Sequence, residues 1–241
     1  MIDRNRGLWP GVLLADFRLL QAFLARMPGL AGLAVMMAGL LFGWWLYVPV
    51  HELLHVAGCL MAGGEVSRLE LAPLYGGDVL EAWLPFVVSG SDYAGQLTGF
   101  DTGGSDWVYQ SCVLLPYAIT IFPGFWLWQR LIGDPGPVTH RHMLLAGALL
   151  PVVAAPLMSL GGDYYESGSI IVSGVVGGLT GHDTEAWRGD DFFLLIGDWP
   201  GWPSTFDAAG IFASLLTGTM LALATLWAGA RLGRALNPVD S

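Results

Sequence analysis

Two histidines and a glutamate stand together in a strongly apolar stretch of the chain, in the order His51-Glu52-Leu53-Leu54-His55. Residues four apart share one face of a helix, so His51 and His55 can present two imidazole nitrogens to one metal ion. Glu52 lies beside them, where its carboxylate can take a proton from a metal-bound water. Chance gives on the order of 0.003 such patterns in a chain of this composition. The spacing therefore predicts a zinc site of the hydrolytic type, with Glu52 as the base.

The apolar surroundings of this motif favour a bound metal. An ionisable side chain inside a membrane helix costs roughly 2.5–3.5 kcal/mol on insertion scales. Three such groups in one turn need compensation, and a divalent cation would supply it. The alternative is a buried polar cluster, in which the histidines bond to the backbone or to a carboxylate.

A catalytic zinc ion usually has three protein ligands and one open position for water. We predict Asp163 as the third ligand, because it directly follows an apolar segment and Gly161-Gly162 allows a close approach of the backbone. Three further residues of zinc-binding type remain open as alternatives: Glu166, Glu185 and His182. Asp163 could instead serve only as the cap of a helix that begins there.

The elements that must position these residues are membrane helices. Of the 241 residues, 54% are hydrophobic and 12% are charged, about half the charged fraction of a typical soluble domain. The net charge of −10 argues against nucleic acid as a partner. Four stretches have the ~20 apolar residues that cross a bilayer: Leu30–Ala62, Trp107–Leu131, His142–Leu160 and Ala208–Ala230. We therefore expect an all-α integral membrane bundle that forms a single domain over residues 1–241, with residues 1–28 as an interfacial amphipathic helix.

The arginines predict the orientation of this bundle. Eight of the ten fall on one side if there are four spans, and the positive-inside rule makes that side cytoplasmic. These eight are Arg4, Arg6, Arg18, Arg26, Arg130, Arg141, Arg231 and Arg234. The connections 64–106 and 161–205 are acidic and are expected to face outward. Both termini should then be cytoplasmic, and we expect residence in a bacterial inner (cytoplasmic) membrane.

The two outward connections contain segments with structure of their own. Residues 65–71 alternate apolar and polar side chains and are followed by Gly76-Gly77, which predicts a small β segment and a turn. Residues 79–88 are a partner strand or an interfacial segment, whereas residues 89–106 are rich in Gly, Ser and Asp and predict a loop. Residues 167–181 predict a short helix that packs closely on a neighbour, for which Gly174 and Gly178 have a suitable spacing, or that dips into the membrane.

The stretch HELLHVAGCLMAGGEVSRLELAPLYGG, residues 51–77, resembles the site-2 protease family of intramembrane zinc metalloproteases. Members carry HExxH in a membrane helix, then small residues and a short β segment near a Gly-Gly, and a downstream aspartate as third zinc ligand. The resemblance implies that His51, His55 and Asp163 bind Zn²⁺ and that Glu52 is catalytic. It further implies an endopeptidase whose partners are the lipid bilayer and a membrane-spanning or membrane-adjacent peptide. The segment Val66–Leu71 could receive an extended substrate by strand addition.

The chain departs from the family pattern around Asp163, where glycines precede the aspartate and Tyr164 follows it. The asparagines of the chain are Asn5 and Asn237, so the family's asparagine near the third ligand has no counterpart, and His182 is one candidate for its role. A CAAX-type membrane metalloprotease, with a glutamate as third ligand, is an alternative function. A non-proteolytic membrane metal-binding protein or scaffold is another, and it would not require Glu52.

Overall fold

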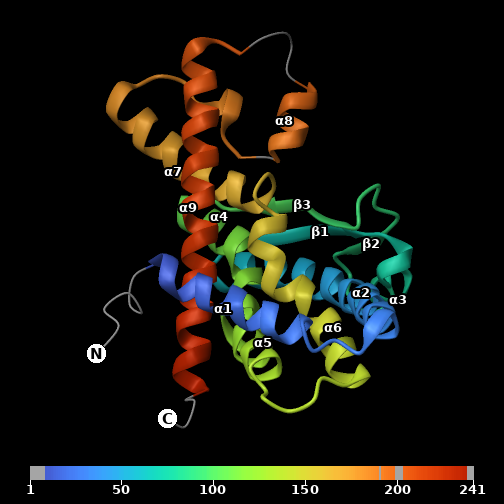
Figure 1. The fold of residues 1–241 in the computed structure, drawn as a ribbon. Helices are drawn as coiled ribbons and strands as arrows, with labels where there is room; N and C mark the ends of the chain where they lie inside the picture. The colour runs from blue at the N-terminus through green and yellow to red at the C-terminus, as the bar shows by residue number, and fades with distance from the viewer. Residues whose placement is uncertain (1–8, 190, 199–202, 238–241) are drawn as a thin grey trace. The chain divides into compact units, whose positions relative to one another are not determined.

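The computed structural model describes residues 9–189, 191–198 and 203–237 (Figure 1). Arg4 and Arg6, which contribute to the predicted orientation, lie outside the described residues. Within these described ranges, four helical segments are long and apolar enough to cross a membrane: Gly29–Met61, Asp106–Ile132, His140–Thr180 and Thr205–Leu236. Of the described residues, 72% are helical, and a small three-stranded sheet accompanies the helices, which confirms the predicted all-α class of membrane protein.

The chain folds into two compact units. Unit 1 consists of Met1–Pro49, Tyr117–Ala155 and Thr225–Ser241, and unit 2 of Val50–Pro116 and Pro156–Ala224. The long helices α2 (Gly29–Met61) and α9 (Thr205–Leu236) contribute residues to both units. All residues predicted to take part in chemistry belong to unit 2.

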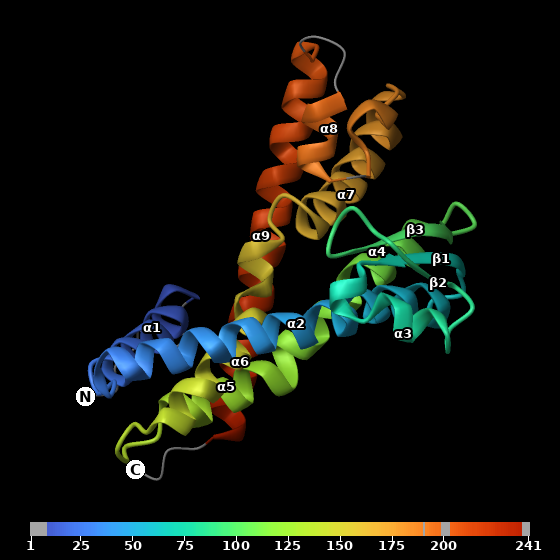
Figure 2. The same cartoon turned by 90° about the vertical axis from the view of Figure 1, so that its right-hand side faces the viewer.

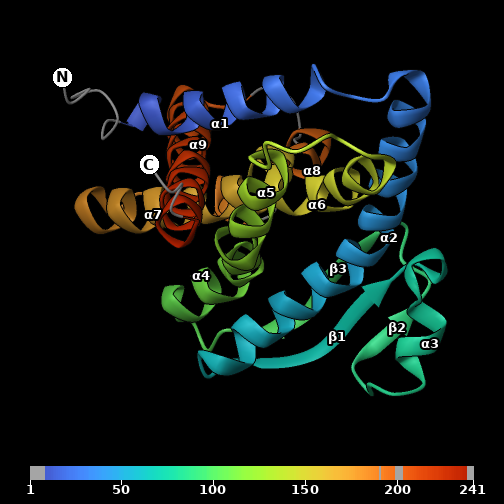
Figure 3. The same cartoon turned by 60° about the horizontal axis from the view of Figure 1, so that its bottom comes forward.

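Unit 1 is built around the N-terminal helix that the sequence predicts, which is α1 (Trp9–Leu24). Val12 and Phe23 are buried on one face of α1, whereas Phe17 is exposed. The buried face packs on α5 (Phe125–Ile132) and α6 (His140–Met158), as Figure 3 shows. One face of α1 therefore covers the core of unit 1, and the interfacial position of residues 1–28 stays a prediction.

A buried polar contact joins three helices of unit 1. The Gln129 side-chain amide donates to both carboxylate oxygens of Asp16, at 2.9 and 3.0 Å. Arg234 donates to the same carboxylate at 2.8 Å. Burial raises the pKa of Asp16, and the bonds from Arg234 and Gln129 oppose that rise. The carboxylate therefore links α1 to α5 and α9 at a cost in desolvation.

Unit 2 contains a three-stranded sheet beside the C-terminal part of α2 (Figures 2 and 3). The strands are β1 (Glu65–Leu71), β2 (Val87–Ser89) and β3 (Gly95–Asp101), in the order β2-β1-β3. β1 pairs in parallel with β2 over Leu69–Leu71 and antiparallel with β3 along its length. The short helix α3 (Gly77–Glu81) lies between β1 and β2 in the chain.

The loop predicted for residues 89–106 is wrong where β3 forms. This segment is rich in Gly, Thr and Asp, yet it forms a strand because its backbone N–H and C=O groups can hydrogen-bond to β1. Its apolar residues Leu97 and Phe100 pack on a buried cluster that includes Cys59 and Val108. Backbone pairing and burial of apolar side chains thus outweigh weak intrinsic strand propensity.

Residues 161–205, predicted as an outward connection, begin with an 18-residue helix, α7 (Asp163–Thr180). α7 packs closely on α9, which it crosses in Figures 1 and 3. The close contact uses Gly168, where a Cβ atom would lie 2.7 Å from the Gly218 nitrogen. The predicted packing glycines have a different environment: a Cβ at Gly178 would meet no atom within 4 Å. The predicted short helix therefore exists but packs through another glycine.

Two further helices complete unit 2. α4 (Asp106–Leu114) follows β3, and Ser105 caps its N-terminus by accepting a hydrogen bond from the Val108 backbone. α8 (Phe192–Asp198) packs Phe192 and Leu195 against a core around Trp187.

Across the described residues of both units, shorter helical turns occur at Pro73–Tyr75, Leu115–Tyr117, Thr120–Gly124 and Glu185–Trp187.

Candidate metal centre

The two histidines of the HExxH motif lie one turn apart on α2 and face each other through their Nε2 atoms, 3.0 Å apart. Both side chains are nearly buried. The Nδ1 atom of His55 is 2.9 Å from the backbone oxygen of Cys112. A carbonyl oxygen can only accept, so Nδ1 carries the proton and Nε2 offers a lone pair. This is the arrangement that orients a histidine as a metal ligand.

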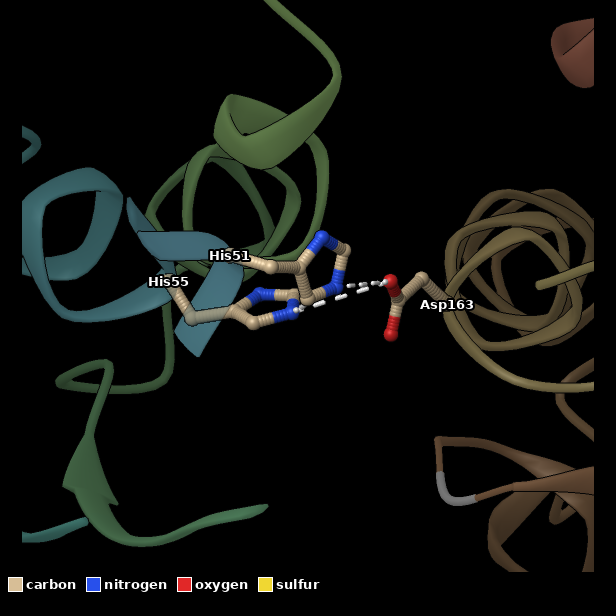
Figure 4. A group of neighbouring side chains, drawn as sticks. All are labelled: His51, His55 and Asp163. Carbon is tan, nitrogen blue, oxygen red and sulfur yellow. Dashed lines mark hydrogen bonds and ion pairs between the residues drawn. The ribbon is translucent and has the colours of Figure 1, made fainter. Parts of the chain in front are cut away.

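Asp163 brings a carboxylate to the same point from the first turn of α7 (Figure 4). Its Oδ2 atom lies 3.2 Å from Nε2 of His51 and 3.6 Å from Nε2 of His55. The cap residue of α7 is Gly162, and no side chain caps that helix. The alternative role of Asp163 as a helix cap is therefore not the one that the structure shows.

The three ligand atoms have the spacing of a tetrahedral metal site. Their separations are 3.0, 3.2 and 3.6 Å. Ligands 2.0–2.1 Å from zinc at tetrahedral angles stand about 3.3 Å apart. Within the residues that the structure describes, this is the one group of three or more such side chains placed to hold an ion. Two imidazoles and one carboxylate are also a donor set that suits zinc.

Among the described residues, the alternative third ligands do not belong to the group that could hold an ion. Glu166 lies one turn after Asp163, and its Oε1 atom accepts a hydrogen bond from the Tyr109 hydroxyl at 2.6 Å. Glu185 is exposed on a 3₁₀ turn, and the ring of His182 lies 4.9 Å from the ring of Phe206. Of the four predicted candidates, the structure brings Asp163 to the two histidines.

A cavity of about 320 Å³ opens beside this group. Glu52, His55 and Asp163 line one part of it, so the predicted base and two predicted ligands border the same space. Much of the rest of the wall comes from β3, α4 and α8, which no motif in the sequence connects with the site. Apolar side chains, including Leu97, Val113 and Leu194, supply much of this wall. A peptide segment with apolar side chains would find a compatible surface here.

Helix α4 sets the register of the two ligand-bearing helices. On one side, its Cys112 carbonyl accepts from His55 of α2. On the other side, Gln110 donates to the Ser167 backbone oxygen at 2.8 Å, and the Ser167 hydroxyl donates back to Gln110 at 2.5 Å. Tyr109 adds the bond to Glu166. No short sequence motif predicts that α4 would connect these two helices, because each hydrogen bond joins residues that are far apart in the chain.

The predicted substrate-binding edge at Val66–Leu71 is wrong in one respect. β1 is the middle strand of the sheet: β3 pairs with one of its edges from Glu65 to Leu71, and β2 pairs with the other edge over Leu69–Leu71. Among the described strands, β2 and β3 each have an outer edge that no strand covers. Because β3 also lines the cavity, an incoming strand would meet the sheet at β3.

None of the known protein families, curated proteins or solved structures with which the chain was compared matches it. Membership of the site-2 protease family therefore stays a prediction that depends on residues 51–77 and Asp163. The geometry of the group formed by His51, His55 and Asp163 does not depend on that resemblance.

Proposed function

We propose that this protein is a zinc-dependent intramembrane endopeptidase of the site-2 protease type. The observation that carries the proposal is the convergence of His51, His55 and Asp163 within zinc-ligand spacing, beside Glu52, at a cavity. A protein that only bound a metal would need the three ligands but not an adjacent carboxylate. The pairing of a ligand triangle with a neighbouring base therefore favours a hydrolase.

The mechanism assigns separate tasks to the residues of the site. His51, His55 and Asp163 would hold Zn²⁺, which supplies a Lewis acid and lowers the pKa of water. Glu52 takes the proton of the attacking water and passes it to the leaving amine. The Cys112 carbonyl keeps His55 in the tautomer that the site needs. The apolar wall limits the access of bulk water.

The proposed substrate is a membrane-spanning or membrane-adjacent peptide. A helix in lipid has its backbone amides bonded internally, so it must unwind before a carbonyl can be attacked. The uncovered edge of β3 offers backbone hydrogen bonds to the unwound segment. Substrate unwinding and strand addition would then occur beside the metal centre.

We further propose a bacterial inner membrane with both termini in the cytoplasm. Unit 1 contains eight of the ten arginines, whereas unit 2 contains sixteen of the twenty acidic residues. The acidic connections 64–106 and 161–205 would then face outward. Fusion of a reporter that fluoresces only in the cytoplasm to the C-terminus should give a fluorescent protein, and a dark, correctly inserted fusion would contradict this orientation.

The function is tested by separating metal binding from turnover. The purified protein should take up about one zinc per chain, measured by atomic emission, and should cleave a labelled membrane peptide in proteoliposomes. Glu52→Gln should keep the zinc and lose cleavage, whereas His51→Ala should lose both. Cleavage that survives in Glu52→Gln would refute the peptidase, and a membrane function unaffected by that change would favour the binding protein or scaffold.

A further inference from the structure

Strand β3 comes unusually close to the proposed base. A Cβ atom at Gly95 would lie 2.5 Å from Cγ and 3.0 Å from Cδ of Glu52. Real Cβ contacts do not approach so closely, so an alanine at this position could not coexist with Glu52 as it stands. The Glu52 side chain therefore occupies the space that a side chain at position 95 would need.

The position of Gly95 is fixed by the sheet and leaves little room for β3 to retreat. Gly95 pairs with Leu71 at one end of the β1–β3 ladder, and Glu65 pairs with Asp101 at the other. Leu71 is fully buried, and its Cδ1 atom would lie 3.0 Å from a Cβ at Gly95. Between these ends, Leu97 packs into the cluster around Cys59. An added methyl group must then displace Glu52, whose Cγ atom is the nearest neighbour of that position.

We propose that Gly95 is a positioning residue for Glu52. Glutamate has several rotatable bonds, so a base at the edge of an open cavity needs a wall that restricts its rotamers. The bare backbone of β3 supplies this wall, with Glu52 packed against Gly95. The inference rests on the proposed function in one respect, since it takes Glu52 to be the base.

The same strand then has two tasks. Its backbone at Gly95 positions Glu52, and its uncovered outer edge, on the strand that lines the cavity, can pair with a substrate segment. A substrate bound to β3 is thereby registered against the strand that also holds the base. Proximity of this kind is a large part of enzymatic rate acceleration, and a displacement of about 1 Å can cost on the order of 100-fold.

The test combines Gly95→Ala with Glu52→Ala in a double-mutant cycle, with the full-length zinc-loaded protein in detergent. Gly99→Ala is the matched control, because a Cβ at Gly99 would also be crowded, at 2.6 Å from Cβ of Arg68, but away from Glu52. Apparent Tm and zinc content are measured for all variants, and cleavage for those that retain Glu52. We expect Gly95→Ala to keep its zinc and lose roughly 10- to 100-fold in kcat, with KM little changed.

The Tm readout needs no substrate, so it stays valid if the peptidase proposal fails. Any Tm loss caused by Gly95→Ala should shrink or vanish in the Glu52→Ala background, while the loss caused by Gly99→Ala should be equal in both. An equal loss from Gly95→Ala in both backgrounds overturns the inference, because the added methyl group would then be meeting something other than Glu52. If Gly95→Ala changes Tm in neither background, kcat decides: a fall supports displacement of Glu52, and wild-type turnover overturns it.

Discussion

Asp163→Asn should weaken zinc binding strongly, whereas Glu166→Gln should not. Asp163 is the proposed carboxylate ligand, and its Oδ2 atom lies 3.2 and 3.6 Å from the two imidazole nitrogens. Glu166 lies one turn further on and bonds to Tyr109. Loss of a residue that only orients a ligand costs about 10- to 100-fold in metal affinity. Loss of the charged ligand itself should therefore raise the zinc Kd by about 100-fold or more.

This difference can be measured in two independent ways. Competition with a chromophoric chelator gives the Kd of each variant. At a zinc concentration well above Kd, a 100-fold change in Kd removes about 2.7 kcal/mol of ligand-induced stability. For a chain of this size that corresponds to roughly 5–11 °C of the zinc-induced rise in apparent Tm. Glu166→Gln should keep the whole rise, because an amide oxygen can still accept from Tyr109.

The opposite result would change the identity of the site. If Glu166→Gln weakens zinc binding as much as Asp163→Asn, the third ligand is a glutamate and the CAAX-type alternative is favoured. If neither change affects the Kd, the carboxylates bind no metal, and the histidine pair has to be interpreted as a structural polar cluster. If Asp163→Asn binds zinc with wild-type affinity while Glu166→Gln does not, Asp163 is not a ligand, and the tetrahedral site deduced from the three distances is refuted.

Three further predictions concern the framework around the site. Gly168→Leu should lower the apparent Tm by roughly 2–12 °C because the added side chain overpacks the contact between α7 and α9. A Cβ at Gly178 would meet no atom within 4 Å, so an equal loss of Tm in Gly178→Leu would contradict this reasoning. Ser167→Ala should cost about 1–3 kcal/mol of stability by removing a buried hydrogen-bond donor, and an unchanged urea midpoint would refute it. Burial raises the pKa of Asp16 above its ordinary 3.8, so its folded form holds the proton more tightly than the unfolded chain. The stability of wild type relative to Asp16→Asn should therefore fall as pH rises above 3.8. The apparent Tm of both proteins, measured against pH, tests this. A rise in the relative stability of wild type over that range would mean that the ion pair with Arg234 outweighs the cost of burial.

Local patterns predicted the parts of the site that depend on a single helix. His51 and His55 share a face because they are four residues apart, and the apolar run around them predicts the helix itself. Asp163 required a step in topology, since it lies 112 residues from His51. Its place after an apolar segment and the two preceding glycines were sufficient for that step. Glu166 and Glu185 offered the same chemistry, so residue type alone could not decide among them.

The sequence did not predict the elements whose role comes from pairing across the chain. The segment that forms β3 is rich in turn-forming residues, and it becomes a strand because β1 is available to pair with it. The importance of Gly95 follows from the position of a side chain 43 residues earlier in the chain, a relation that only the fold establishes. The roles of Tyr109 and Gln110 likewise depend on α7, to which both side chains donate hydrogen bonds.

The hydrogen bonds of α4 explain how ligands from two distant helices can meet. Three polar side chains brought together in an apolar region lose their hydration, so their approach must be supported by other contacts. α4 provides that support on both sides, through His55 and Cys112 toward α2 and through Gln110 and Ser167 toward α7. The close approach of α7 to α9 at Gly168 adds a second constraint on Asp163. A scaffold of this kind holds the donors at metal-ligand spacing, which is the preorganisation that a catalytic metal centre requires.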